Sequence, residues 1–333
     1  MIRSRTLISQ ALSVLTDNIR RTGDPLGLKT AYWTEWAKGL NLPRSGDALL
    51  FTARMYQMVA YITQLTSLLA SAKPLVERKI FGDIAKLGTR VMGDKIIRWR
   101  AGRAGDLKTA TTQALRGIAT ALLAIGNQPA YLYEDEPYSG ALLYDLGLDE
   151  FLPEHISKVY GTIKETGIKK VIGTDPHTVL MLQEVYPKYI DNYDLEVKHY
   201  SHILLENIGK LKAAQKRRIE EKFVIHDSCL MARNLGLIAE PRELLQGLGV
   251  TALEPENKKL DTFCCGGPVE YAFPEMTEKV SRMRVEELAK VSKNIVVTCP
   301  ICFLNLNKYE QELGVNVLDL GEILYELLTT SEA

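Results

Sequence analysis

The sequence predicts an α/β fold with two pseudo-symmetric lobes, each a small parallel sheet flanked by helices, plus a helical amino-terminal extension and insertion. Two observations lead to this fold class. Short runs rich in apolar and β-branched residues alternate with helical segments along the 333-residue chain, which is the order of parallel βαβ units. The two halves of the chain also repeat the same order of blocks, which indicates an internal duplication.

The individual elements follow from the local pattern. The chain begins with an amphipathic helix over residues 1–21, and residues 55–127 are mostly helical. Strands are expected where a short apolar run is bounded by polar, glycine or proline residues. The expected strands cover residues 48–51, 131–133, 169–174 and 195–200 in the first half, and 222–228, 250–255, 293–298 and 315–320 in the second.

The duplication pairs each cysteine of the second half with a residue of another type in the first half. The alternative, chance similarity between two βαβ halves, is disfavoured because both halves share turn residues at matching positions. The aligned pairs are Arg54 with Cys229, Tyr138 with Cys264, Ser139 with Cys265, Gly140 with Gly266, Asp175 with Cys299, and Thr178 with Cys302.

These patterns also predict the domain organisation. A helical extension covers residues 1–47, and a cysteine-free domain covers 48–208 with a helical insertion at about 57–127. A second domain covers 222–333, and the charged segment 209–222 is expected to be the helix that joins the two.

Composition excludes several classes of function. The chain carries 41 basic and 41 acidic residues, so its overall charge does not favour nucleic acid. No apolar run approaches the roughly 18 residues of a transmembrane helix, and the amino terminus lacks a signal-peptide pattern, so we expect a cytoplasmic protein. The basic segment 94–108 is either a solvated face or a contact for a partner subunit or the inner face of the membrane.

All five cysteines lie between residues 229 and 302, an odd and clustered set that indicates metal or redox chemistry rather than a disulfide framework. Each group follows a strand or sits in a turn, and the carboxyl ends of parallel strands meet at one edge of a sheet. Five converging thiolates exceed the four of tetrahedral zinc and fit an iron–sulfur cluster. Gly266 and Gly267 allow the backbone to approach such a cluster closely. The five cysteines are Cys229, Cys264, Cys265, Cys299 and Cys302.

The spacing of these cysteines, with the adjacent pair followed by Gly-Gly-Pro and the last two as Cys-Pro-Ile-Cys, resembles the cysteine-rich (CCG) domain of heterodisulfide reductase B and D subunits. Related domains occur in iron–sulfur subunits that serve glycolate, lactate, glycerol-3-phosphate and succinate oxidation. The resemblance implies a noncubane 4Fe–4S cluster held by the five cysteines. Because the first domain lacks thiols, it implies a degenerate first CCG domain without a cluster.

The resemblance implies an iron–sulfur subunit of a heterodisulfide-reductase-like complex, an oxidoreductase that acts on a sulfur-containing substrate or a protein-bound thiol. Its partners would be a ferredoxin-like C-type subunit and a flavoprotein A-type subunit. One alternative is a non-catalytic subunit that carries electrons from a flavoprotein dehydrogenase to quinone. Another is a zinc-stabilised binding module.

Two further residues are candidates for catalysis. His226, three residues before Cys229, either serves the cluster through a proton or a hydrogen bond, or closes a strand as a satisfied histidine. Arg54 either contacts substrate or forms an ion pair with Asp175 in the vacated site. His155, His199 and His202 are expected at the surface.

Overall fold

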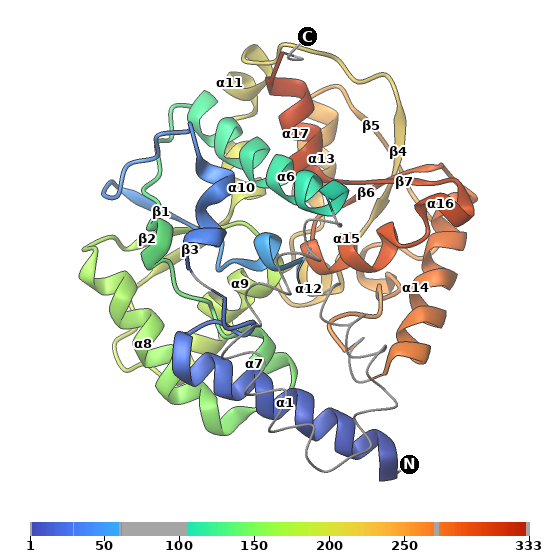
Figure 1. Cartoon of the computed structure of the whole chain (residues 1–333). Coiled ribbons are helices and arrows are strands. Elements are labelled where there is room, and N and C mark those ends of the chain that lie inside the picture. The colour runs from blue at the N-terminus through green and yellow to red at the C-terminus, as the bar shows by residue number, and fades with distance from the viewer. Residues whose placement is uncertain (1, 29, 60, 62–104, 270–272, 331–333) are drawn as a thin grey trace.

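The computed structural model describes residues 2–28, 30–59, 61, 105–269 and 273–330. Two small parallel sheets lie side by side, each flanked by helices, which confirms the predicted fold class (Figure 1). Part of the predicted insertion and of the basic segment 94–108 falls on residues 62–104, outside the described residues. The predicted domain boundaries stay a prediction.

The amino-terminal sheet contains three parallel strands in the order β1 (Ala48–Phe51), β2 (Lys170–Gly173) and β3 (Glu196–His199). The carboxy-terminal sheet contains four parallel strands. Their order is β5 (Thr251–Leu253), β4 (Lys222–His226), β6 (Asn294–Val297) and β7 (Asn316–Asp319). Strands β1, β2 and β3 therefore correspond to β4, β6 and β7.

The strand predicted at 131–133 is wrong, and seven of the eight predicted strands are present. Ala130 alone makes a parallel bridge with Leu49 of β1, at the side where β5 pairs with β4 in the other sheet. The next amide, Tyr131 N–H, donates to the Pro43 carbonyl instead, at 2.8 Å. The chain then turns into the 3-10 helix η2 (Tyr133–Asp135). The fourth strand of the first lobe is thus reduced to one residue.

Helices connect the strands of the amino-terminal lobe, and the predicted amino-terminal helix is present. The elements are α1 (Ile2–Thr22), η1 (Thr30–Ala37), α6 (Gly105–Ala124), α7 (Ala141–Asp145), η3 (Asp149–Phe151), α8 (Leu152–Glu165), α9 (Pro176–Leu180), η4 (Met181–Val185), η5 (Tyr186–Lys188), α10 (Tyr200–Glu206) and α11 (Ile208–Ala213). The predicted joining helix 209–222 is only partly correct. Helix α11 ends at Ala213, and the amides of Lys216 and Arg217 donate to the Leu327 carbonyl.

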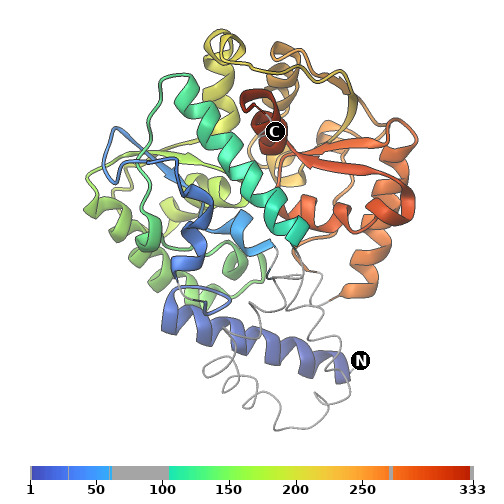
Figure 2. The same cartoon turned by 45° about the horizontal axis from the view of Figure 1, so that its top comes forward.

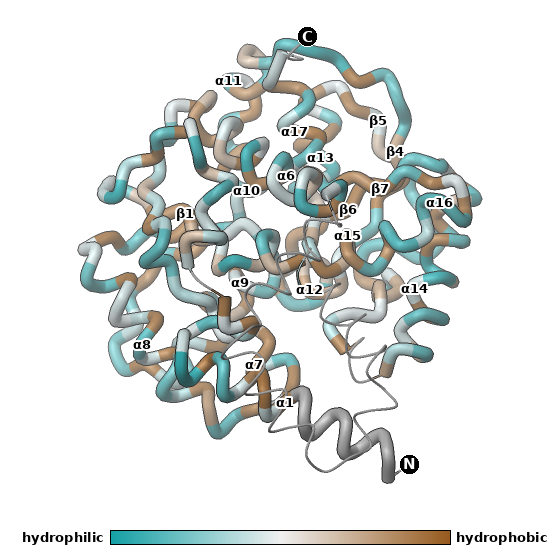
Figure 3. Tube along the Cα trace, viewed as in Figure 1, coloured by the Kyte–Doolittle hydropathy of each residue, from teal (hydrophilic) through white to brown (hydrophobic). Residues whose placement is uncertain are grey.

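The carboxy-terminal lobe follows the same plan. Its helices are α12 (Cys229–Arg233), α13 (Ala239–Gly247), η6 (Lys259–Asp261), α14 (Pro274–Ala289), α15 (Pro300–Asn307), α16 (Glu310–Leu313) and α17 (Leu320–Leu328). Hydrophilic residues predominate along α14, whereas the neighbouring strands are largely hydrophobic (Figure 3). This is the pattern of a sheet covered by amphipathic helices.

Helices of the two lobes pack against each other across the interface. Helix α6 of the first lobe packs on α17 of the second, and α13 of the second packs on α10 of the first. Two views show α6 and α17 crossing between the sheets (Figures 1 and 2). The crossing is close because it is lined by small residues: a Cβ added to Gly117 would lie 1.9 Å from the Gly321 carbonyl oxygen.

Both apolar cores contain residues of both lobes. One core contains Leu50 of β1, Val296 of β6 and side chains of the helices at the interface. The other core contains Phe51 of β1 and Val297 of β6. Alternate residues of each strand therefore point into different cores, as the period of a strand requires. Each core therefore spans both lobes, and this fixes the sheet edges relative to each other.

Candidate metal centre

The five cysteines come together at the carboxyl edge of the second sheet. Cys229 opens α12 directly after β4, and Cys299 is the N-cap of α15 directly after β6. Cys302 lies in the first turn of α15. The adjacent pair Cys264 and Cys265 follows η6, in the connection after β5. Crossover connections thus bring distant cysteines to one edge, as the sequence predicts.

The five sulfurs form a continuous chain of contacts. Cys229 hydrogen-bonds Cys264, which also hydrogen-bonds Cys265. Cys265 contacts Cys302, and Cys302 contacts Cys299. Hydrogen bonds from Cys229 and Cys265 lower the pKa of Cys264, and the same contacts contribute to raising the pKa values of Cys229 and Cys265. Sulfurs this close cannot all ionise unless positive charge lies among them, so the set fits a metal group bound through thiolates.

The centre has a buried side and a more open side. Cys265, Cys299 and Cys302 are buried, whereas Cys229 and Cys264 are half-buried. The open side is bounded by Gly266, whose φ of +92° favours glycine and whose amide donates to Cys264 Sγ at 3.3 Å. A Cβ there would lie 2.9 Å from Thr277 Cγ2. Gly267 follows with a cis bond to Pro268, and its predicted contact with the cluster stays a prediction.

The equivalent edge of the first lobe has the backbone that the duplication predicts. Asp175 is the N-cap of α9 and precedes a proline, as Cys299 does for α15. Gly140 has a φ of +84°, close to that of Gly266. Buried polar atoms without a hydrogen-bond partner gather in these turns, namely Ser139 Oγ, Thr174 Oγ1, Asp175 Oδ2 and Thr178 Oγ1.

The two edges face each other. Helix α9 contacts α12, and both lie near the centre of the molecule (Figure 1). His177 of α9 is buried, with Nδ1 2.9 Å from Asp145 Oδ2, and it also hydrogen-bonds Cys299. Burial opposes charge on His177, but these two contacts raise its pKa well above the ordinary value. The first lobe therefore contributes a buried histidine to the surroundings of the cysteine site.

Arg54 lies at the edge of the first lobe, where its side chain bonds to other residues of the same chain. Its side chain is buried, with Nη1 3.1 Å from Asp24 Oδ2, and Nη2 donates to the Glu136 carbonyl. The expected ion pair with Asp175 is therefore replaced by one with Asp24. Burial, only partly offset by Thr52 and Arg54, raises the pKa of Glu136 to about 7. A substrate contact by Arg54 remains a prediction.

His226 ends β4 and is buried beside the cysteines. A ring nitrogen of His226 and the sulfurs of Cys265 and Cys302 lie within 4.8 Å of one another. Its Nδ1 accepts a hydrogen bond from Arg284 Nε at 3.0 Å, while Nε2 has no protein partner. Burial, with the Arg284 charge, lowers the pKa of His226 to about 3.

Sequence reasoning missed Arg284 and the inward position of two histidines. Arg284 is fully buried on α14, where Thr277, Ser281 and Leu288 share its face. That spacing of three and four residues is the signal that could have placed it inside. The surface positions predicted for His155 and His199 are wrong, since both are buried.

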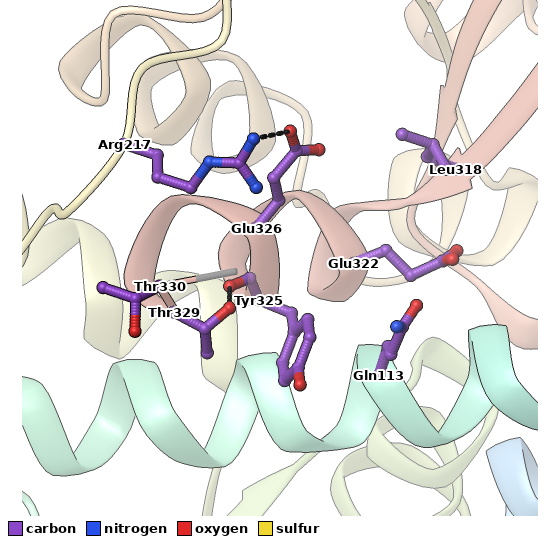
Figure 4. A pocket seen from close by; sticks show the side chains of 8 residues that line it. All are labelled: Gln113, Arg217, Leu318, Glu322, Tyr325, Glu326, Thr329 and Thr330. Atoms are coloured by element: carbon purple, nitrogen blue, oxygen red, sulfur yellow. Dashed lines mark hydrogen bonds and ion pairs between the residues drawn. The ribbon is translucent and has the colours of Figure 1, made fainter. Parts of the chain in front are cut away.

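A surface hollow lies apart from the cysteines. It has a volume of about 340 Å³ and lies between α6 and α17, where Gln113, Tyr325 and Glu322 face it (Figure 4). Arg217 and Glu326 form an ion pair at its rim, 3.8 Å apart. None of its lining residues is a cysteine, so it is not part of the candidate centre.

Residues 223–307 match the family model of the cysteine-rich (CCG) domain. This segment begins in β4, ends with α15 and contains all five cysteines. The resemblance predicted from the cysteine spacing is therefore confirmed for this part of the chain. In the described residues, no helix is both long and apolar enough to cross a membrane.

Three curated proteins extend the comparison. The chain is 27% identical over 212 residues to the EtfAB:quinone oxidoreductase of Syntrophomonas wolfei, covering 60% of this chain and 29% of that protein. It is 27% identical to the "Probable iron-sulfur-binding oxidoreductase" of Bacillus subtilis, covering 59% and 28%. It is 28% identical to a subunit of the fumarate reductase (CoM/CoB) of Methanothermobacter marburgensis, covering 43% and 30%. The chain thus spans less than a third of each of these relatives.

Proposed function

We propose that this protein is an iron–sulfur electron-transfer subunit of an oxidoreductase, with one 4Fe–4S cluster held by Cys229, Cys264, Cys265, Cys299 and Cys302. The observation that carries the proposal is the convergence of all five sulfurs at one sheet edge, where each contacts the next in a continuous chain. An iron–sulfur cluster would supply one-electron redox chemistry there. The protein's part is to bind the cluster through thiolates and to surround its inner side with buried groups.

The relatives support the electron-transfer role. Their names refer to a quinone oxidoreductase, an iron–sulfur-binding oxidoreductase and a fumarate reductase subunit. We propose that partner subunits supply the other functions of such an oxidoreductase. These would be a ferredoxin-like C-type subunit and a flavoprotein A-type subunit, in the cytoplasm or at the inner face of the membrane.

The finer proposal is a noncubane cluster that serves thiol–disulfide chemistry in a heterodisulfide-reductase-like complex. It is supported by five thiolates where a cubane needs four, and by the relative named for fumarate reduction with CoM/CoB. The competing proposal is electron relay to quinone, supported by the relative named EtfAB:quinone oxidoreductase and by the burial of three of the five cysteines.

A substitution series tests the ligand set. Serine at each cysteine should reduce the iron bound after anaerobic reconstitution, because a hydroxyl replaces a thiolate at a ligand position. The aligned positions of the first lobe provide matched controls, so Ser139→Ala and Thr178→Ala should bind iron as the wild type does. Equal iron content in all seven variants would refute the ligand assignment.

The two finer proposals differ in the partner that reoxidises the reduced protein. In the disulfide proposal, a mixed disulfide added in excess reoxidises the dithionite-reduced complex and yields two thiols. In the relay proposal, a water-soluble quinone reoxidises it and the disulfide does not. Absorption in the visible range follows both reactions, and a colourless protein that contains zinc would favour the binding-module alternative.

A further inference from the structure

We propose that Arg284 is a positioning residue that holds His226 as the neutral tautomer protonated on Nε2, so that this N–H donates to sulfur at the metal centre. The proposal deepens the proposed function and rests on it for the identity of the centre. It assigns a role to a side chain of α14 that lies outside the cysteine turns.

The first step is the tautomer. Arg284 Nε donates to His226 Nδ1 at 3.0 Å, and a guanidinium group has donors but no acceptor. Nδ1 must therefore carry the lone pair. A neutral imidazole with the lone pair on Nδ1 carries its proton on Nε2.

The second step concerns the atom that accepts a hydrogen bond from this Nε2–H group. His226 Nε2 is buried and has no partner in the protein. A ring nitrogen of His226 lies within 4.8 Å of the sulfurs of Cys265 and Cys302, and Nδ1 is already occupied by Arg284. A buried N–H without a partner is costly, so we expect this N–H to donate to a sulfur of the metal group that these two cysteines would hold.

The same geometry prevents His226 from ligating the metal. To ligate through Nε2, the ring would have to move its proton to Nδ1, where it would meet the Arg284 Nε–H. Arg284 therefore keeps His226 next to the cysteines without allowing it to become a ligand, so that all ligands are sulfur atoms. This explains why a histidine can lie so close to the cysteines without joining the ligand set.

Arg284 is itself firmly held, which a positioning residue requires. It is fully buried, and Nη1 donates to the Asn257 carbonyl at 2.8 Å and to Glu287 Oε2 at 2.7 Å. Nη2 lies 3.3 Å from Thr262 Oγ1, which donates to the Asp227 carbonyl at 3.0 Å. The guanidinium thus ties the end of β4 to the segment that leads into Cys264.

The first experiment determines the tautomer in the full-length, metal-free chain by nitrogen-15 NMR of labelled histidines. We expect the His226 shifts of the Nε2–H form at pH 7, and a mixture of tautomers in Arg284→Met, which keeps length but loses the donor. Arg284→Lys keeps a donor and should restore much of the preference. Arg282→Met, an exposed change on the same helix, is the control.

The second experiment measures the midpoint potential of the iron-loaded protein. His226→Leu and Arg284→Met should each shift it to more negative values, and the double variant should match the larger single shift because the residues act in series. A His226 proton on Nδ1 in the wild type would overturn the proposal, as would a shift in His226→Leu alone. Failure of the wild-type protein to bind iron would instead refute the proposed function. The NMR result would then decide the Arg284 proposal by itself.

Discussion

Two buried side chains at equivalent positions of the lobes cap their helices with different chemistry. His199 Nδ1 accepts from the Ser201 amide at the start of α10, at 3.3 Å. Asp319 Oδ1 accepts from the Gly321 amide at the start of α17, at 2.8 Å. Burial lowers the pKa of His199 to about 3 and raises that of Asp319 to about 7. Both residues therefore favour their neutral forms in the folded protein.

These pKa values predict opposite effects of pH on stability. The His199 contribution is fully present above its unfolded pKa of 6.5 and is lost as pH falls from 6.5 toward 3. The Asp319 contribution is present below its unfolded pKa of 3.8 and is lost as pH rises from there to about 7.

The histidine contribution can be isolated with His199→Asn, since asparagine still caps a helix. Urea unfolding at several pH values should show the wild type losing up to about 1.4 kcal/mol per pH unit relative to this variant below pH 6.5. Above pH 6.5 the difference should be constant. His202→Asn changes a half-buried histidine whose ring lies 3.3 Å from Glu206 Oε1, and we expect no such loss of stability on acidification. Parallel curves for wild type and His199→Asn would contradict the assignment.

Gly266→Ala tests the turn that carries the adjacent cysteines. The new Cβ would lie 2.9 Å from Thr277 Cγ2 at a φ of +92°, so we expect a loss of about 1–3 kcal/mol and reduced iron binding. Gly140→Ala is the matched change in the first lobe, where the Cβ would lie 2.8 Å from His155 Cδ2. It should lose stability and still bind iron. Equal iron loss in both variants would show that the effect is not local to the centre.

At the scale of elements, strands were easier to predict than connections. Apolar runs such as 222–228 and 293–298 formed β4 and β6 because their burial on both faces leaves few alternatives. The strand predicted at 131–133 does not form because the Tyr131 N–H donates to the Pro43 carbonyl. The segment 209–222 carries a helical pattern, but the amides of Lys216 and Arg217 donate to the Leu327 carbonyl of α17, which no local pattern reveals.

The crossing of α6 and α17 gives a prediction at this scale. Gly117→Ala would place a Cβ 1.9 Å from the Gly321 carbonyl oxygen, so the helices must separate. We expect a loss of about 3 kcal/mol in the free energy of unfolding, measured by urea denaturation. Gly161→Ala on α8 meets nothing within 4 Å and should be neutral or gain up to about 1 kcal/mol. Similar values for the two variants would contradict the tight crossing.

At the scale of the whole molecule, one lobe carries the cysteines and the other completes their surroundings. The cysteine set could be predicted because crossover topology fixes where strand ends meet. The contacts of His177 with Cys299 and of Arg284 with His226 could not, since each joins elements far apart in sequence. The shared cores fix the position of the first lobe relative to the cysteine site.

The most direct test of this account is the amount of iron and acid-labile sulfide in the full-length protein purified without oxygen. One 4Fe–4S cluster per chain predicts about four iron and about four sulfide, with absorption in the visible range that dithionite changes. A folded protein that carries about one zinc per chain and no sulfide would contradict the central claim.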